Sequence, residues 1–312
     1  MVRFDYRGQK SLEIQKLRGF YWAVRCHSLS EAAQKIHVTQ SAISQQVKSL
    51  EAELGVKLYE RSGRGILPTP EGERLASYAR QILNSMDDLE SEFAELRARP
   101  HGTIRIASFR GIAIYHLPWI VKRFRRQHPE VKLAVASKTY DREILRAVSD
   151  GEVDIGLTSS WNEFADVEYF EILSYDMYVC TPLNHPWAEE RHRLSLNEIA
   201  EQSLILYEQG TSIRSHIDSI FAKHGLTPDV NIEVGGFQAL REYVRIGLGI
   251  AILSGLMIEE SDPEVIYAIP VTDIFGKLGY GIVLRKGRYV SSAVREFMVA
   301  AGVPTQQIPT VV

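Results

Sequence analysis

The sequence of 312 residues predicts an α/β protein with an all-α head that ends in a β-hairpin. Apolar residues at helical spacing, followed by a glycine-rich basic segment, predict the head. A heptad repeat of apolar residues over 75–96 predicts one long helix. Residues 103–302 alternate between apolar strand-like runs and helical runs, which is typical of a sheet covered by helices. We therefore expect a head over 1–70, a connecting helix over 71–100 and a large domain over 101–312.

The head should begin with two short helices. The first is indicated by apolar residues at positions i, i+3, i+4 and i+7, which are Leu17, Phe20, Tyr21 and Val24. Ser28 and Glu31 form a capping-box pattern ahead of the second helix, expected from Ser30 to Lys35. After a turn, Thr39 is the expected N-cap of a third helix that ends near Gly55. Two helices joined by a tight turn, the second of them exposed, predict a helix-turn-helix.

The third helix carries two separate stripes. Its apolar stripe should face the core and consists of Ile43, Val47, Leu50 and Leu54. Its polar stripe should face outward and consists of Ser41, Ser44, Gln45 and Lys48. Short hydroxyl and amide groups, with no acid before Glu51, can bond to base edges and phosphates without repelling DNA. The alternative on spacing alone is a plain helical bundle with one uncharged face.

A glycine-rich basic tip follows the third helix. Ser62-Gly-Arg-Gly65 lies between two short extended segments, which predicts a β-hairpin wing. Arg61 and Arg64 would lie over the phosphate backbone or the minor groove. Residues 1–70 hold 11 Lys and Arg and 6 Asp and Glu, which gives this segment a net charge of +5. Because the whole chain has a net charge of −3, residues 71–312 carry −8. A basic head on an acidic body favours contact with nucleic acid through the head.

These motifs together resemble the signature of LysR-type transcriptional regulators, from Ser28 to Arg74. The family pairs two alanines on the second helix with Q-S-A-x-S at the start of the recognition helix, here Gln40–Ser44. It continues with L-E-x-x-L-G-x-x-L-Y-x-R, here Leu50–Arg61, and with T-x-x-G at residues 69–72. Pro68 departs from the family, which commonly has leucine there, and roughly ten extra residues precede the head.

The spacing and the resemblance predict a winged helix-turn-helix that binds double-stranded promoter DNA. The expected DNA contacts come from Ser30, Thr39, Gln40, Ser41, Ser44, Gln45, Lys48, Arg61 and Arg64. Bound beside a promoter, such a regulator is expected to change the access of RNA polymerase.

The connecting helix has no proline between Glu71 and Arg99. Its apolar residues are spaced 4, 3, 4, 3, 4, 3 and are Leu75, Ala79, Ile82, Met86, Leu89, Phe93 and Leu96. So narrow a stripe favours a partner helix, and hence a homodimer, over a helix that packs within one chain. A dimer would read a two-part site. Assembly into a tetramer is implied only by the resemblance, because LysR-type proteins commonly form dimers of dimers.

Eight strands are expected in the large domain, in a mainly parallel sheet. They are residues 103–107, 131–136, 154–158, 177–181, 204–206, 231–234, 250–253 and 280–284. Helices are expected at residues 117–127, 142–149, 213–224 and 239–246. Ligands bind such sheets at the carboxyl ends of the strands, where helix N-termini point.

The residues at those strand ends are small and hydroxylated. The candidate effector contacts are Ser108, Phe109, Arg110, Ser137, Lys138, Thr139, Thr158, Tyr207, Gln209 and Thr211. Hydroxyl groups beside Arg110 or Lys138 suit a small anion or polar acid as the effector. The alternative is that each Ser or Thr simply caps a helix.

The large domain resembles the LysR effector domain along phrases such as "SDGEVDIGLT" and "YVRIGLGIAIL". The resemblance implies a type 2 periplasmic-binding-protein-like fold with the effector in a cleft between two α/β lobes. Lobe one would comprise residues 103–173 and 275–302, and lobe two residues 174–270. The phrases are somewhat closer to the cysteine-biosynthesis regulators. Those have a threonine-rich first loop, whereas this chain has Ser108-Phe-Arg-Gly, so the effector stays unidentified.

Enzyme, metal and membrane functions find no support in the sequence. G-x-S-x-G, a P-loop, H-E-x-x-H and a G-x-G-x-x-G after a strand are all absent, so we expect no catalysis and no cofactor. His185 and His192, with acids between them, lie in a polar loop and are not expected to bind metal. Cys26 and Cys180 should be reduced, and with only Cys180 in the large domain a disulfide-based peroxide switch is rejected. No long apolar run or apolar leader is present, which opposes a secreted solute-binding protein and indicates the cytoplasm.

Overall fold

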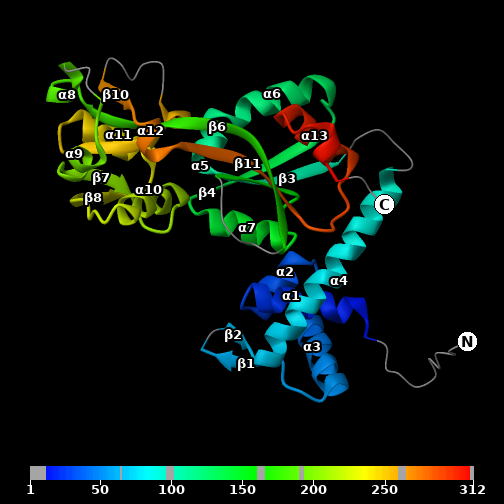
Figure 1. The fold of residues 1–312 in the computed structure, drawn as a ribbon. Helices are drawn as coiled ribbons and strands as arrows, with labels where there is room; N and C mark the ends of the chain where they lie inside the picture. Colours follow the sequence, from blue (N-terminus) through cyan, green and yellow to red (C-terminus); the bar gives the residue numbers. More distant parts are fainter. Residues whose placement is uncertain are drawn as a thin grey trace, which may run out of the picture. The chain divides into compact units, whose positions relative to one another are not determined.

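The computed structural model describes residues 12–63, 65–95, 102–159, 166–189, 193–258 and 265–309. The chain divides into two compact units, Met1–Phe93 and Ala94–Val312. Figure 1 shows a small, mostly helical first unit and a second unit built on an elongated sheet.

Three helices of the first unit pack around one core: α1 (Ile14–Arg25), α2 (Leu29–Lys35) and α3 (Gln40–Leu54). Their apolar stripes meet, because Phe20, Ile43, Val47 and Leu50 are all fully buried. Leu54 was expected to face this core, but it is largely exposed, since α3 ends there and the chain turns away at Gly55. Gly55 has a φ of +71°, a left-handed conformation that favours glycine.

Side-chain caps fix where α2 and α3 begin. The Ser28 hydroxyl accepts a hydrogen bond from the Glu31 N–H (3.3 Å), and the Thr39 hydroxyl accepts one from the Ala42 N–H (3.2 Å). A full capping box would also have the Glu31 side chain accept a hydrogen bond from the Ser28 N–H. Here the Ser28 N–H donates instead to the Ala23 carbonyl (3.2 Å) near the end of α1. The turn between the first two helices is therefore held by the preceding helix.

The wing is an antiparallel hairpin of β1 (Tyr59–Ser62) and β2 (Gly65–Pro68). Ser62 pairs with Gly65, and Gly63 after Ser62 has a φ of +55°. The Ile66 N–H donates to the His27 carbonyl (3.0 Å), so the hairpin is attached to the turn before α2. A Cβ on Gly65 would lie 2.7 Å from that carbonyl, and this close approach requires glycine.

Helix α4 (Pro70–Glu95) has 26 residues and is about 39 Å long. Ala79 and Leu83 belong to the buried core of the first unit, together with residues of α1, α2 and α3. Most of α4 thus belongs to the same compact unit as the helix-turn-helix.

The second unit is built on nine strands. They are β3 (Thr103–Phe109), β4 (Lys132–Lys138), β5 (Ile155–Ser159), β6 (Val167–Pro182), β7 (Leu204–Tyr207), β8 (Val230–Val234), β9 (Ile250–Ser254), β10 (Ile266–Pro270) and β11 (Lys277–Arg285). The order is β4-β3-β5-β11-β6-β9-β7-β8, and β10 pairs with β6.

The long strand β6 divides this sheet into two lobes. Its first part, up to Asp176, pairs with β11, and its second part, from Met177, pairs with β9 and β10. Lobe one therefore contains β4, β3, β5 and β11, and lobe two contains β7, β8, β9 and β10. Figure 1 shows β6 running through both lobes.

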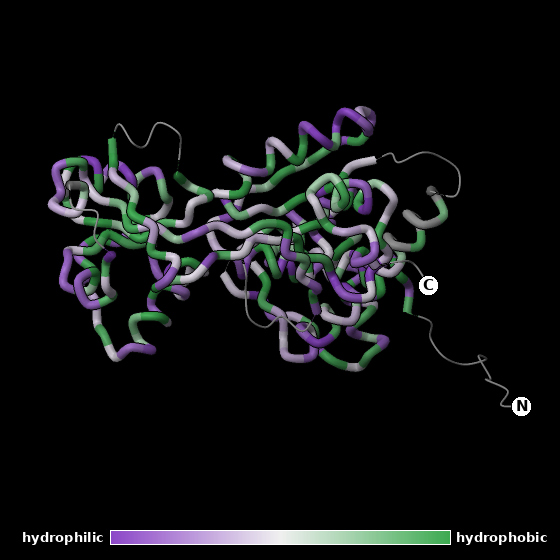
Figure 2. Tube along the Cα trace, turned by 45° about the horizontal axis from the view of Figure 1, so that its top comes forward, coloured by the Kyte–Doolittle hydropathy of each residue, from purple (hydrophilic) through white to green (hydrophobic). Residues whose placement is uncertain are grey.

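Helices cover both lobes. Lobe one carries α5 (Arg110–Tyr115), α6 (Leu117–Gln127), α7 (Asp141–Ser149) and α13 (Ser292–Ala301). Lobe two carries α8 (Pro186–Glu189), α9 (Leu196–Ala200), α10 (Ser212–Lys223), α11 (Phe237–Arg245) and α12 (Thr272–Phe275). Short 3-10 turns lie at Gly255–Met257 and Thr305–Gln307. One hydrophobic cluster runs through the whole unit, and Figure 2 shows hydrophobic residues along the strands of lobe two.

The expected strands all form, with three differences. The strand expected at 177–181 begins ten residues earlier, at Val167. Its first part was not expected, because it is half exposed and carries acids such as Glu168. Strand β10 was not expected. The sheet is parallel only on either side of its centre, since β6 and β11 run antiparallel to their neighbours where the chain crosses between lobes.

Candidate functional site

The polar face of α3 is the candidate nucleic-acid surface of the first unit. Thr39, Gln40, Ser41, Gln45 and Lys48 are exposed on it. Ser44 is half-buried, and Ser30 is exposed on α2. The Thr39 and Ser41 hydroxyls lie within a hydrogen bond of each other (3.0 Å), so the cap of α3 also orders the first turn of this face.

The two acids of α3 are both engaged by other parts of the first unit. Glu51 accepts hydrogen bonds from the Leu58 N–H and from the Lys57 ammonium, each at 3.0 Å. Glu53 accepts from the Lys16 ammonium at 2.7 Å and from the Ser49 hydroxyl at 2.9 Å. These pairs neutralise the negative charge near the C-terminal half of α3, which leaves the polar face suited to phosphate.

The wing places Arg61 on an exposed strand, opposite Ile66. Arg64, the second arginine expected to contact DNA, lies outside the described residues.

The heptad stripe of α4 faces two ways. Ala79 is fully buried in the core of its own unit and offers no surface to a partner helix, while Leu75 and Met86 are half-buried. The exposed apolar side chains are Tyr78 (54%), Ile82 (42%), Leu89 (53%) and Phe93 (58%). Tyr78 was not among the expected residues, and Leu96 lies outside the described residues.

A cavity of about 220 Å³ lies between the two lobes of the second unit. Its lining comes from Phe109, Arg110, Gly111, Ile114, Thr139, Tyr207, Glu208, Thr211, Gly235, Gly236, Phe237, Gln238, Ala239 and Met257. Phe109 to Thr139 belong to lobe one, and Tyr207 to Met257 belong to lobe two. A molecule in this cavity would contact both lobes at once.

Five of the expected effector residues line this cavity, namely Phe109, Arg110, Thr139, Tyr207 and Thr211. The other five, Ser108, Ser137, Lys138, Thr158 and Gln209, are not among the lining residues. Ser108 and Thr158 are fully buried, whereas Ser137 and Gln209 are exposed and Lys138 is half-buried. The Ser108 hydroxyl donates to the Phe109 carbonyl (3.1 Å).

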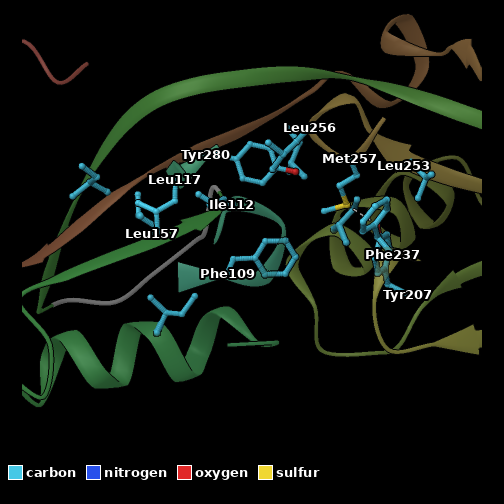
Figure 3. Packing of buried hydrophobic residues seen from close by; sticks show 14 of the residues in the cluster. Phe109, Ile112, Leu117, Leu157, Tyr207, Phe237, Leu253, Leu256, Met257 and Tyr280 are labelled. Carbon is cyan, nitrogen blue, oxygen red and sulfur yellow. Dashed lines mark hydrogen bonds between the residues drawn. The ribbon is translucent and has the colours of Figure 1, made fainter. Parts of the chain in front are cut away.

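One wall of the cavity is apolar. Figure 3 shows Met257 beside Phe237 and Tyr207, with Phe109 on the other side of Met257. The Tyr207 hydroxyl donates to the Met257 sulfur (2.8 Å). Burial raises the pKa of Tyr207 well above its usual value, so this phenol stays neutral.

The polar side of the cavity has charges of both signs. Arg110 lies at the start of α5 and Glu208 directly after β7. Helix α11 begins beside them with Gly236 as its N-cap, at a φ of +109° and with no side-chain cap. The first N–H groups of α11 belong to residues that line the cavity, and such groups attract negative charge.

A buried carboxylate joins the two lobes next to the cavity. Asp141, the first residue of α7, accepts hydrogen bonds from the Thr158 hydroxyl and from the Ser159 N–H (3.3 Å) and hydroxyl (3.2 Å). Its other oxygen accepts from the Ser212 hydroxyl and N–H (3.3 Å) at the start of α10 in lobe two. The Thr158 hydroxyl expected at the effector therefore binds Asp141 instead.

The lining residues that were not expected are mostly glycines, apolar residues and Glu208. Gly235 and Gly236 follow β8, so the rule that ligands bind at the carboxyl ends of strands pointed to them as well. Glu208 lies between Tyr207 and Gln209, both of which were candidate effector contacts. Met257 had no signal, because it reaches the cavity from the 3-10 turn after β9.

Metal-binding clusters of three or more His, Cys, Asp or Glu are absent among the residues that the structure describes, which exclude His192. Within the same described ranges, no helix has the length and apolar character to cross a membrane. Neither Cys26 nor Cys180 forms a disulfide in the part of the chain that the structure describes.

Two family models match this chain. Residues 14–73 match the bacterial regulatory helix-turn-helix protein model of the lysR family. Residues 97–301, about two thirds of the chain, match the LysR substrate binding domain. The chain belongs to the LysR family. It is a DNA-binding transcriptional regulator with a C-terminal effector-binding domain, and not an enzyme.

Its relatives include other LysR-type regulators. The chain is 29% identical to the HTH-type transcriptional regulator SsuR of Burkholderia cenocepacia, over 89% of this chain and 91% of that protein. It is 28% identical to CysB of Haemophilus influenzae, over 87% of this chain and 84% of that protein. The cysteine-regulator branch noted in the sequence is therefore among the relatives.

Solved structures share the fold. A full-length OxyR variant from Pseudomonas aeruginosa has a TM-score of 0.77 at 22% identity, covering 93% of this chain and 94% of that one. The cofactor-binding domain of the Cbl regulator has a TM-score of 0.62 at 28% identity, covering 67% of this chain and 92% of that one. The winged helix-turn-helix, long helix and two-lobed α/β domain are those of a LysR-type protein.

Proposed function

We propose that a small polar or anionic effector binds in the cavity between the lobes and modulates promoter binding by the helix-turn-helix. The observation that carries this proposal is the lining itself, which comes from both lobes. A ligand there would bind one arrangement of the lobes more tightly than another. This difference in affinity shifts the equilibrium between the two arrangements. Arg110 and the uncapped start of α11 supply the groups that a negative charge requires.

The first unit would supply the sequence-reading contacts. We propose that Gln40 and Ser44 contact base edges, and that Arg61 and Arg64 contact phosphates. The remaining proposed DNA contacts are Ser30, Thr39, Ser41, Gln45 and Lys48. The engaged acids of α3 support this assignment, because the exposed groups on its polar face then carry no negative charge.

We further propose that the exposed side of α4 pairs with α4 of a second copy. Tyr78, Ile82, Leu89 and Phe93 form the exposed apolar surface, to which the sequence adds Leu96. The segments would then act as a DNA-binding head over 1–70, a dimerising helix over 71–100 and an effector domain over 101–312. We also propose that two such dimers form a homotetramer. The tetramer would contact RNA polymerase and act in the cytoplasm, where the promoter lies.

The proposed mechanism couples the cavity to DNA. The effector would draw the two lobes together, and the change would pass to the heads and alter their spacing on DNA. Altered spacing changes the bending of the promoter and the access of RNA polymerase.

A thermal-shift experiment on the full-length protein tests the effector site. The panel contains sulfate, acetylated serines, aromatic acids and amino acids. A ligand at 100 times its dissociation constant should stabilise the second unit by about 2.7 kcal/mol. The variant Thr139→Trp, which places a large ring in the cavity, should abolish the shift. Lys138→Trp, at the neighbouring residue outside the lining, should preserve it.

Two outcomes would contradict the assignment. A ligand that stabilises both variants equally binds elsewhere. No stabilisation by any member of the panel would show that the switch does not depend on a small polar molecule in this cavity.

A further inference from the structure

The cavity between the lobes contains one charged side chain from each lobe. Among the described lining residues, the charged side chains are Arg110 of lobe one and Glu208 of lobe two. Their formal charges cancel. A purely anionic ligand would therefore find a favourable partner on one side and a carboxylate on the other.

Glu208 is held in place by its surroundings. Its N–H donates to the Val234 carbonyl (3.2 Å), and a Cβ on Gly235 would lie 3.1 Å from its carboxylate oxygen. The phenol of Tyr140, in lobe one, has a raised pKa, chiefly because it donates a hydrogen bond to this carboxylate. The Glu208 carboxylate thus has one partner beside the cavity and can accept a further hydrogen bond.

A second negative charge close to Glu208 is unfavourable, because like charges repel each other, and more strongly at a half-buried position than in bulk water. A cationic group at the same place is favourable and gains a charge-assisted hydrogen bond. The carboxylate therefore selects against a dianion and for a ligand that carries a positive group at this end.

The opposite requirement holds on the lobe-one side of the cavity, where Arg110 is the charged side chain among the described lining residues. The first N–H groups of α11 lie on the Glu208 side, because a Cβ on Gly235, just before the N-cap of α11, would lie 3.1 Å from the Glu208 carboxylate. Arginine binds a carboxylate well. The complementary ligand carries one group of each sign.

Size and the apolar wall limit the rest of the ligand. The volume of about 220 Å³ is below the roughly 300–1,000 Å³ of pockets that hold drug-sized molecules, so the ligand is small. Phe109, Ile114, Phe237 and Met257 form the apolar side. This space accepts a small aliphatic or thioether side chain.

We propose that the effector is a small zwitterion, an α-amino acid with an apolar side chain. Its carboxylate binds Arg110, and its ammonium group faces Glu208. This proposal rests on the proposed function, in which the cavity holds the effector, and narrows its ligand to one chemical class.

Titration calorimetry on the full-length protein tests the charge requirement with matched pairs of ligands. The probes are the neutral L-amino acids from alanine to methionine, each beside the carboxylic acid that lacks only the amino group, such as L-leucine and 4-methylpentanoate. Isopentylamine, which is leucine without its carboxylate, is the third probe. At least one amino acid should bind, and each partner with a single charge should bind about tenfold more weakly or worse.

The variant Glu208→Gln tests the residue that carries the argument. It should weaken the amino acid by about tenfold and strengthen the matching carboxylic acid, because it removes one negative charge while keeping the side-chain shape. Glu201→Gln, the same substitution at an exposed glutamate of lobe two outside the lining, is the matched control and should change neither affinity.

The outcomes separate this inference from the proposed function. Carboxylic acids or sulfate that bind as tightly as amino acids, with binding blocked by Thr139→Trp, would overturn the zwitterion and leave the effector site standing. A failure of every amino acid to bind would also overturn the zwitterion. Amino acids that bind with the same affinity after Glu208→Gln would show that Glu208 does not select the ligand.

Discussion

The two candidate sites are built in different ways. The polar face of α3 lies on one helix, whose start is capped by Thr39 and whose buried side packs on a fully enclosed core. The cavity is shared by two lobes that meet at β6 and at hydrogen bonds such as those of Asp141 with Ser212. A surface on one capped helix keeps its shape, whereas a cavity between two lobes changes when the lobes move. The arrangement therefore separates recognition of DNA from response to a ligand.

The largest expected effect concerns whether the first unit dimerises through α4. Replacing Leu89 with aspartate places two buried charges in the proposed α4 pair and removes two leucine side chains from it, which should cost about 4 kcal/mol of association. Light scattering after gel filtration should show a lower molar mass, because the chains no longer pair through α4. Ser77→Asp, an exposed position on another side of α4, should leave the mass unchanged. An unchanged mass for both variants would exclude this face as the dimer contact.

The next largest effect concerns the joint between the lobes. Replacing Asp141 with alanine leaves the buried hydroxyls of Thr158 and Ser159 without their shared acceptor and removes the bond to Ser212. We expect the free energy of unfolding of the second unit to fall by about 3 kcal/mol in urea. Asp218→Ala, a half-exposed acid that pairs with Arg214, should cost about 1 kcal/mol or less. Equal losses for the two variants would mean that the buried network adds nothing special to the joint.

A smaller effect is expected for base recognition. Replacing Gln40 with alanine should weaken binding to the specific DNA site by about 2 kcal/mol. The variant should bind random DNA almost as tightly as the unchanged protein does. Fluorescence anisotropy with both DNAs measures the ratio. Ligand binding in the cavity should not change, because Gln40 lies in the other unit. An equal loss on specific and random DNA would contradict its role in reading bases.

The smallest effect is expected for Arg61. Its replacement by alanine should weaken specific and random DNA alike, by about 1 kcal/mol, and lower the salt dependence of log K by about one unit. The measurement is affinity against salt concentration. A loss confined to the specific site would instead assign Arg61 to a base edge.

The first unit was largely predictable because its information is local. A cap such as Thr39, the stripes of α3 and the turn at Gly55 each depend on residues within a few positions. The periodicity of α4 was also clear, but it does not say which surface each apolar residue meets. Ala79 faces its own core while Leu89 is exposed, and this depends on where α1, α2 and α3 lie.

The cavity was only partly predictable because its residues come from segments far apart in the chain. The rule on the carboxyl ends of strands pointed to Phe109, Arg110 and Tyr207, which line the cavity. Thr158 lies at such an end too, but Asp141 takes up its hydroxyl, and no local pattern pairs these two residues. The first part of β6 was missed because its apolar and acidic residues mix where the strand is half exposed.

The unbroken course of β6 has a mechanical consequence. Its pairing passes from β11 at Asp176 to β9 at Met177 without an intervening loop, and a register shift lies nearby at Tyr280 and Gly281. A change in the angle between the lobes therefore has to twist this strand and its ladder of hydrogen bonds. Twisting would misalign these hydrogen bonds, so the ladder favours one angle between the lobes. If the proposed ligand changes that angle, its departure would let the lobes return to it.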